Sequence, residues 1–229
     1  MKKLYVCALF LAGLFATQVM TAQKAVKPED LPAPTTNFIS DDDGGVVQIV
    51  PVGLSPAGTG KANTAPAMKS IRQVSVFLGS AWAEQSVRNR EASLSDLTGH
   101  SQLALLQMQN VSVLPAAPSV EDFADLNSAN LREPVNDLTI QNKLVEMLES
   151  KTLPTPDAST VFVVFLAPGV KLTVGKHTAG VHFAAYHNLV HVEAGELRYV
   201  VVPFNGNAGQ EAMAASLGIV NTVFNPASN

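Results

Sequence analysis

The stretch Thr160-Val-Phe-Val-Val-Phe-Leu166 is a nearly unbroken run of apolar residues, and it ends at Ala167-Pro168-Gly169. A strand that faces solvent on one side alternates apolar and polar residues, whereas a strand covered on both faces is apolar throughout. The run therefore predicts a central strand of a sheet that has other elements packed on both of its faces.

Periodic patterns on either side of this run predict the other elements. Val74, Val76 and Leu78 alternate with neighbouring polar residues, which indicates a half-buried strand. The further expected elements are helices at 81–98 and 102–109, a strand at 110–114, a loop-rich stretch at 116–135, a helix starting at Asn136 or Asp137, strands at 180–186 and 197–202, and a turn at 188–193. This order predicts a single α/β (α+β) domain over residues 71–229, with a mixed sheet and packed helices.

The last expected helix, residues 210–224, has helical periodicity and carries no charge after Glu211. A helix without charged residues is typical of a buried position. The residues expected to face the core are Met213, Leu217, Val220 and Phe224. Gly218 lies in the interior of this helix, where glycine costs about 0.5–1 kcal/mol, and the sequence shows no compensating gain.

The first 22 residues are expected to be a secretory signal peptide. Lys2 and Lys3 precede an apolar segment at residues 4–16, and small residues allow cleavage after Ala22. A membrane-spanning helix needs about 20 apolar residues, so no span is expected after cleavage. Residues 23–70 are rich in Pro, Ala and Thr and are expected to form a flexible leader, with one short strand at 46–50. The protein is therefore expected to be secreted or periplasmic.

The composition excludes several classes of function. Hydrophobic residues make up 47% of the 229-residue chain, which is enough to fill a core. The chain has 15 Lys and Arg against 19 Asp and Glu, and its pI is about 5.7, which argues against nucleic-acid binding. Cys7, the only cysteine, lies in the signal segment, so the mature chain can form no disulfide. No nucleophile elbow, phosphate-binding loop or His-Glu-x-x-His helix is present in the sequence.

Clustered histidines are the chemically distinctive feature of the mature sequence. Neutral imidazoles are good zinc ligands, and His182, His187, His191 and Glu193 are the candidates for a metal site. Their spacing matches no established zinc motif, and hydrogen-bonded or surface histidines are the ordinary alternative. We therefore assign no catalytic, cofactor-binding or metal residues from the sequence, and keep these four as candidates only.

A family resemblance covers the chain from about Ile71 onward. The segments that carry it are VSVFLGSAW at 74–82, LPTPD at 153–157, VFVVFLAPGV at 161–170, AYH at 185–187 and YVVVPF at 199–204. In this order and spacing, they resemble secreted bacterial proteins related to the plant phosphate-induced, EXORDIUM-like group. The resemblance implies a zincin-like scaffold and, at His187, a histidine that the family shares.

The last helix of that family carries Ser-His-Glu-x-x-Glu-x-x-Thr-Asp-Pro, which is similar to a zinc-peptidase helix. The aligned segment here is Ser216-Leu-Gly-Ile-Val-Asn-Thr-Val-Phe-Asn-Pro226. Leu217 stands at the histidine position, Gly218 at the first glutamate and Asn221 at the second. Leucine cannot bind zinc and glycine cannot act as a base. The resemblance thus implies a zincin-like scaffold, truncated after the active-site helix, without zincin catalysis.

Three functional hypotheses are compatible with these features. The first is an exported, non-catalytic relative of a metallopeptidase-like family, a pseudoenzyme that binds an envelope or extracellular protein partner. The second is an active zinc-dependent hydrolase with a site rebuilt from His182, His187, His191 and Glu193. The third is a purely structural or interaction protein. Zinc is expected as a cofactor only under the second hypothesis.

Overall fold

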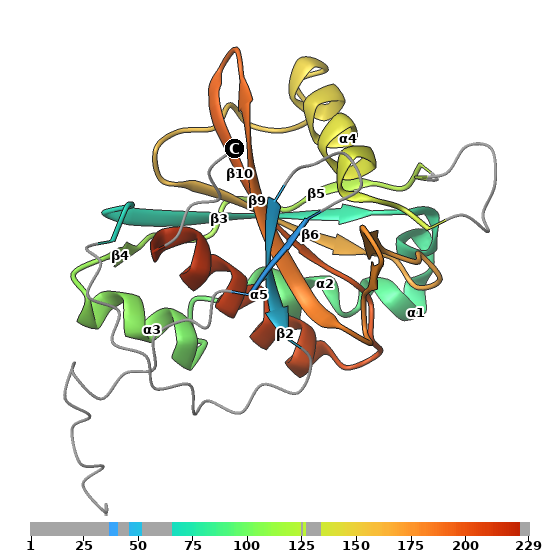
Figure 1. Cartoon of the computed structure of the whole chain (residues 1–229), viewed down its shortest axis with the longest axis horizontal. Coiled ribbons are helices and arrows are strands. Elements are labelled where there is room, and N and C mark those ends of the chain that lie inside the picture. Colours follow the sequence, from blue (N-terminus) through green and yellow to red (C-terminus); the bar gives the residue numbers. More distant parts are fainter. Residues whose placement is uncertain (1–36, 41–45, 52–65, 125, 127–133, 225–229) are drawn as a thin grey trace, which may run out of the picture.

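The computed structural model describes residues 37–40, 46–51, 66–124, 126 and 134–224. Within these residues, helices pack on both faces of a curved, mixed β-sheet (Figure 1). This architecture confirms the fold class expected from the sequence. The expected signal peptide, residues 1–22, and most of the expected leader lie outside the described residues.

The sheet has the strand order β1-β2-β9-β10-β6-β3-β4, and β5 also pairs with β3. Its strands are β1 (Asn37–Ser40), β2 (Val46–Pro51), β3 (Ser70–Leu78), β4 (Ser112–Val113), β5 (Val120–Asp122), β6 (Thr160–Leu166), β9 (Phe183–Val192) and β10 (Gly195–Val202). A separate two-stranded sheet consists of β7 (Thr173–Val174) and β8 (His177–Thr178). β6 pairs in parallel with both β3 and β10, whereas β9 pairs antiparallel with both β10 and β2.

The apolar run at residues 160–166 forms β6, and every residue of this strand is buried. Alternate side chains enter two separate cores: Val161, Val163 and Phe165 lie in one, and the side chains between them lie in the other. The prediction of a strand covered on both faces is confirmed. Parallel pairing on both sides requires crossover connections: helices lie between β3 and β6 in the sequence, whereas β7, β8 and β9 lie between β6 and β10.

Helices cover the two faces unequally. One face carries α1 (Gln85–Arg88), α2 (Glu91–Ser95), α3 (Ser101–Met108) and α5 (Ala208–Phe224), and the other carries α4 (Asp137–Glu149) (Figure 1). α4 begins where the sequence predicts, because the Asn136 side chain accepts a hydrogen bond from the Thr139 backbone N–H at 2.9 Å. Its buried stripe of Ile140, Leu144 and Met147 seats the helix on the sheet.

The long helix expected at residues 81–98 is instead three short helical pieces: a 3₁₀ turn (Ser80–Ala83), α1 and α2. The break occurs at Glu84, whose backbone is extended. This break allows Trp82 to enter the core, where its indole N–H donates a hydrogen bond to the Phe165 carbonyl at 3.1 Å. The centroids of the Trp82 and Phe77 rings are 4.9 Å apart. Burial of this large side chain outweighs the continuation of local helix geometry.

The described part of the expected leader contains strands. β2 contains the short strand considered at residues 46–50, and it pairs antiparallel with β9, while β1 pairs with β2. The ordered unit therefore extends to the N-terminal side of residue 71. β2 supplies backbone partners to the edge of β9, which would otherwise present unpaired N–H and C=O groups. This pairing is made by the backbone, so apolar composition does not reveal it.

α5 is mostly buried, as its lack of charge predicts, but it is rotated from the expected orientation. Met213, expected to face the core, is 40% exposed. The buried side includes Ala215, Gly218 and Thr222, with Gly218 against Val200 of β10, whereas Leu217, Val220 and Phe224 are only partly buried. Small side chains on this face bring the helix axis close to the sheet, which the large side chains of the expected stripe would prevent.

Candidate functional site

His187 lies in the middle of β9, beneath α5. It pairs with Val200 of β10 on one side and Gln48 of β2 on the other, and it is fully buried. Burial lowers the pKa of His187 from 6.5 to about 3, so the imidazole is neutral at physiological pH. Its position inside the sheet is that of a core histidine.

The other candidate ligands of the sequence analysis lie elsewhere. His182 is exposed in the turn before β9, where its Nδ1 accepts a hydrogen bond from the Thr178 backbone N–H at 2.9 Å. His191 is on the same strand as His187, four residues and about 13 Å further along it. Glu193 is in the turn after β9. The structure does not bring these four side chains together, and no group of three or more metal-binding side chains occurs among the described residues.

The expected turn at residues 188–193 is shorter than predicted. β9 continues to Val192, and the turn to β10 consists of Glu193 and Ala194. Pairing of His191 with Glu196 and of Val192 with Gly195 keeps the strand extended to this point. Alternating side chains of β9 consequently face opposite sides of the sheet.

The α5 segment aligned with the family's zinc helix packs directly on the sheet. A Cβ at Gly218 would lie 2.4 Å from Cγ1 and 3.2 Å from Cγ2 of Val200. Asn221, one turn later, is 6% exposed. The sequence shows no gain that offsets the cost of this helical glycine, but the structure supplies one, because only glycine permits this approach. The face that holds ligands in a zinc helix is here the packing face.

A buried polar network joins α4 to the β9–β10 hairpin. Asp137, in the first turn of α4, is 1% exposed. Its Oδ1 accepts a hydrogen bond from the Tyr199 hydroxyl at 2.7 Å, and its Oδ2 accepts from Asn188 Nδ2 at 2.9 Å and Gln141 Nε2 at 2.7 Å. Burial, with the adjacent Asp137 carboxylate, raises the pKa of Tyr199 far above its usual range, so its hydroxyl remains a donor. The network is closed from solvent and fixes the position of α4.

Charged groups gather at the carboxyl ends of the parallel strands, where open α/β sheets often bind ligands. Arg88 donates to Glu121 of β5 at 3.2 Å and lies 4.9 Å from the centroid of the Phe123 ring. Burial, followed by the neighbouring Glu121 carboxylate, raises the pKa of Glu91 to about 7. These acidic side chains are thus engaged with one another and with an arginine.

A second ion pair at this edge closes the loop after β10. Glu211 accepts hydrogen bonds at Oε1 from the Asn205 and Gly206 backbone N–H groups, at 2.8 and 3.1 Å. Its Oε2 accepts from Arg90 at 2.5 Å, and the Arg90 guanidinium lies 4.5 Å from the centroid of the Phe204 ring. Because Glu211 is 2% exposed, this pair ties α5 to the α1–α2 segment rather than presenting charge to a ligand.

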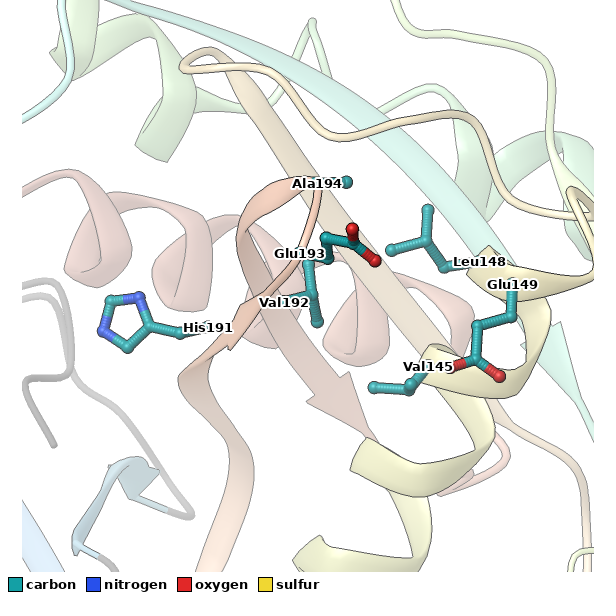
Figure 2. A pocket seen from close by; sticks show the side chains of 7 residues that line it. All are labelled: Val145, Leu148, Glu149, His191, Val192, Glu193 and Ala194. Carbon is teal, nitrogen blue, oxygen red and sulfur yellow. The ribbon is translucent and has the colours of Figure 1, made fainter.

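A hollow between α4 and the β9–β10 turn is a different kind of site (Figure 2). Its volume is about 430 Å³, and its lining comes from the C-terminal half of α4 and from the hairpin tip. Figure 2 shows the Glu193 side chain extending toward Leu148, while the His191 ring points away. The residues that line the hollow, and that define it, are Val145, Leu148, Glu149, His191, Val192, Glu193 and Ala194.

Two of the sequence candidates, His191 and Glu193, therefore line the hollow, whereas His182 and His187 do not. The α4 side of the hollow, which contributes Glu149, is not among the site residues expected from the sequence. No local signal identifies Glu149, because its neighbour across the hollow lies far away in sequence and becomes adjacent only through packing of α4 on the sheet.

Comparison with known proteins adds no relative: no family model, curated protein or solved structure matches the chain. Among the described helices, none combines the length and the apolar composition that a membrane crossing requires.

Proposed function

We propose that the chain is an exported, non-catalytic relative of the EXORDIUM-like secreted proteins that binds a ligand or protein partner at the cell envelope or outside the cell. One observation carries the proposal: at the aligned position of the zinc helix, Gly218 rests against Val200. A zinc ligand and a general base must face an open cavity that admits substrate. Here the corresponding helix face is occupied by the sheet.

The substitutions and the packing support the same interpretation. Leu217 and Asn221 replace a histidine and a glutamate of the family pattern, and Asn221 is buried. Restoring a glutamate at residue 218 would place its Cβ 2.4 Å from Val200 Cγ1, well inside the contact distance of two carbon atoms. The family's catalytic pattern and the present seating of α5 are therefore mutually exclusive, which supports a binding role over peptide hydrolysis.

A rebuilt zinc hydrolase has less support. It would need His182, His187, His191 and Glu193 to converge within about 2.0–2.2 Å of one ion. His187 is buried beneath α5, whereas Glu193 lies in the turn at the hollow. The third hypothesis, a purely structural protein, predicts the same fold but no ligand in the hollow. Measurement of ligand binding therefore separates it from the proposed binding function.

Zinc content tests the proposal. The protein is purified after export, incubated with zinc, dialysed and analysed by inductively coupled plasma mass spectrometry, with a known zinc peptidase carried through the same steps. We expect no stoichiometric zinc, and intact-mass analysis should show a chain that begins at Gln23. One retained zinc per chain, or peptide cleavage that Asn221→Ala abolishes, would overturn the proposal.

A further inference from the structure

The hollow presents negative charge above an apolar floor. Glu149 enters from the last turn of α4 and Glu193 from the hairpin turn, while Val145, Leu148 and Val192 supply aliphatic surface between them (Figure 2). No lysine or arginine is among the residues that line the hollow. A ligand in this site therefore meets carboxylates and hydrocarbon together.

Two other acidic side chains on α4 and the hairpin have ion-pair partners. Glu146, three residues before Glu149 on α4, has an ion pair with Lys143 at 3.3 Å. Glu196, opposite His191 in the hairpin, forms an ion pair with Arg198. Neither Glu149 nor Glu193 forms an ion pair with any residue that the structure describes. Both are exposed and therefore accessible to an external cation.

We infer that the hollow binds a protonated aliphatic amine, with the ammonium held between Glu149 and Glu193 and the alkyl chain on Val145, Leu148 and Val192. The inference deepens the proposed binding function and rests on it. Long cationic side chains commonly lay their methylene groups on apolar surface while the charge remains in water. An anion of the same length would fit the floor but would be repelled by both carboxylates.

An alkylammonium group can come from two sources, a free alkylamine or the lysine side chain of a peptide. At about 430 Å³, the hollow lies within the usual range of ligand sites and can hold an alkylammonium group of either origin. Because the carboxylates are exposed, each contributes modestly to binding, and the affinity should fall as salt screens them. Replacing both by glutamine should weaken binding about five- to tenfold.

The experiment is an NMR titration of the purified protein with n-hexylamine and, separately, with N-acetyl-lysine-N-methylamide. Hexanoate is the ligand of opposite charge. The test variant is Glu149→Gln with Glu193→Gln. The matched control is Glu84→Gln, which removes one negative charge at an exposed position outside the hollow. Backbone amide shifts are followed at both walls, residues 148–149 and 192–194.

We expect at least one amine to shift both walls, with weaker binding in the double variant, unchanged binding in Glu84→Gln and no response to hexanoate. Binding of hexylamine alone assigns a free amine, and binding of the lysine amide assigns a peptide side chain. No shift with either amine, or equal binding by the double variant, overturns the inference. Zinc retention that Asn221→Ala abolishes overturns the proposed function alone, because the hollow contains no residue of the aligned helix.

Discussion

Replacing Gly218 by alanine tests how tightly α5 is seated on β10. The new Cβ would lie 2.4 Å from Val200 Cγ1, whereas carbon atoms in contact normally stay about 3.5–4.0 Å apart. The helix or the strand must therefore move by about 1 Å, because Val200 is buried, β-branched and restricted in rotation. Overpacking of this kind costs about 1–3 kcal/mol, and the better helix propensity of alanine offsets up to about 1 kcal/mol. We expect a net loss of about 1–2 kcal/mol in the free energy of unfolding.

Urea denaturation followed by the fluorescence of the buried Trp82 measures this loss as a lower midpoint at an unchanged slope. Gly209→Ala is the matched control on the same helix, because the nearest atom to its new Cβ is Asn207 Oδ1 at 3.4 Å. It should leave stability unchanged or raise it. Adding Val200→Ala to Gly218→Ala should cost less than the sum of the two single changes. A Gly218→Ala protein as stable as the control would refute the close packing.

Two further perturbations test the buried polar groups. The folded protein keeps His187 neutral down to pH of about 3, whereas the unfolded chain binds a proton below about 6.5, so stability should fall as pH decreases through this window. The urea midpoints at pH 7.5 and 5.0 should differ less in His187→Gln than in the native protein. An identical difference would contradict the lowered pKa of His187. Asp137→Ala leaves the buried Tyr199 hydroxyl and Asn188 amide without their acceptor. It should lower the free energy of unfolding by about 3 kcal/mol, measured by the same denaturation. Tyr199→Phe removes one donor and should cost about half as much; the reverse order would contradict the central place of the carboxylate.

Features that rest on neighbouring residues were predictable. The apolar run that forms β6 and the cap at Asn136 are both local patterns, and both are confirmed. Prediction failed where distant contacts compete with local preference. Trp82 breaks a helix because its indole reaches Phe165, far away in sequence, and β9 continues to Val192 where a turn was predicted, because it pairs with β10.

The candidate site was likewise predictable only in its local features. Glu193 could be singled out from sequence as an acidic residue beside a histidine, but its place in a hollow depends on Glu149 across the gap. The resemblance in the α5 segment drew attention to Leu217, Gly218 and Asn221, but it could not predict which of them faces the sheet.

Composition and periodicity alone were enough to establish the fold class, the central strand and the burial of α5, because burial of apolar surface and capping of helix ends act through the local order of residues. The rotation of α5, the seating of Gly218 on Val200 and the approach of Glu149 to the hairpin depend on packing between elements distant in the chain. Periodicity indicates that a helix has a buried face, but the volume of the side chains opposite selects which face that is.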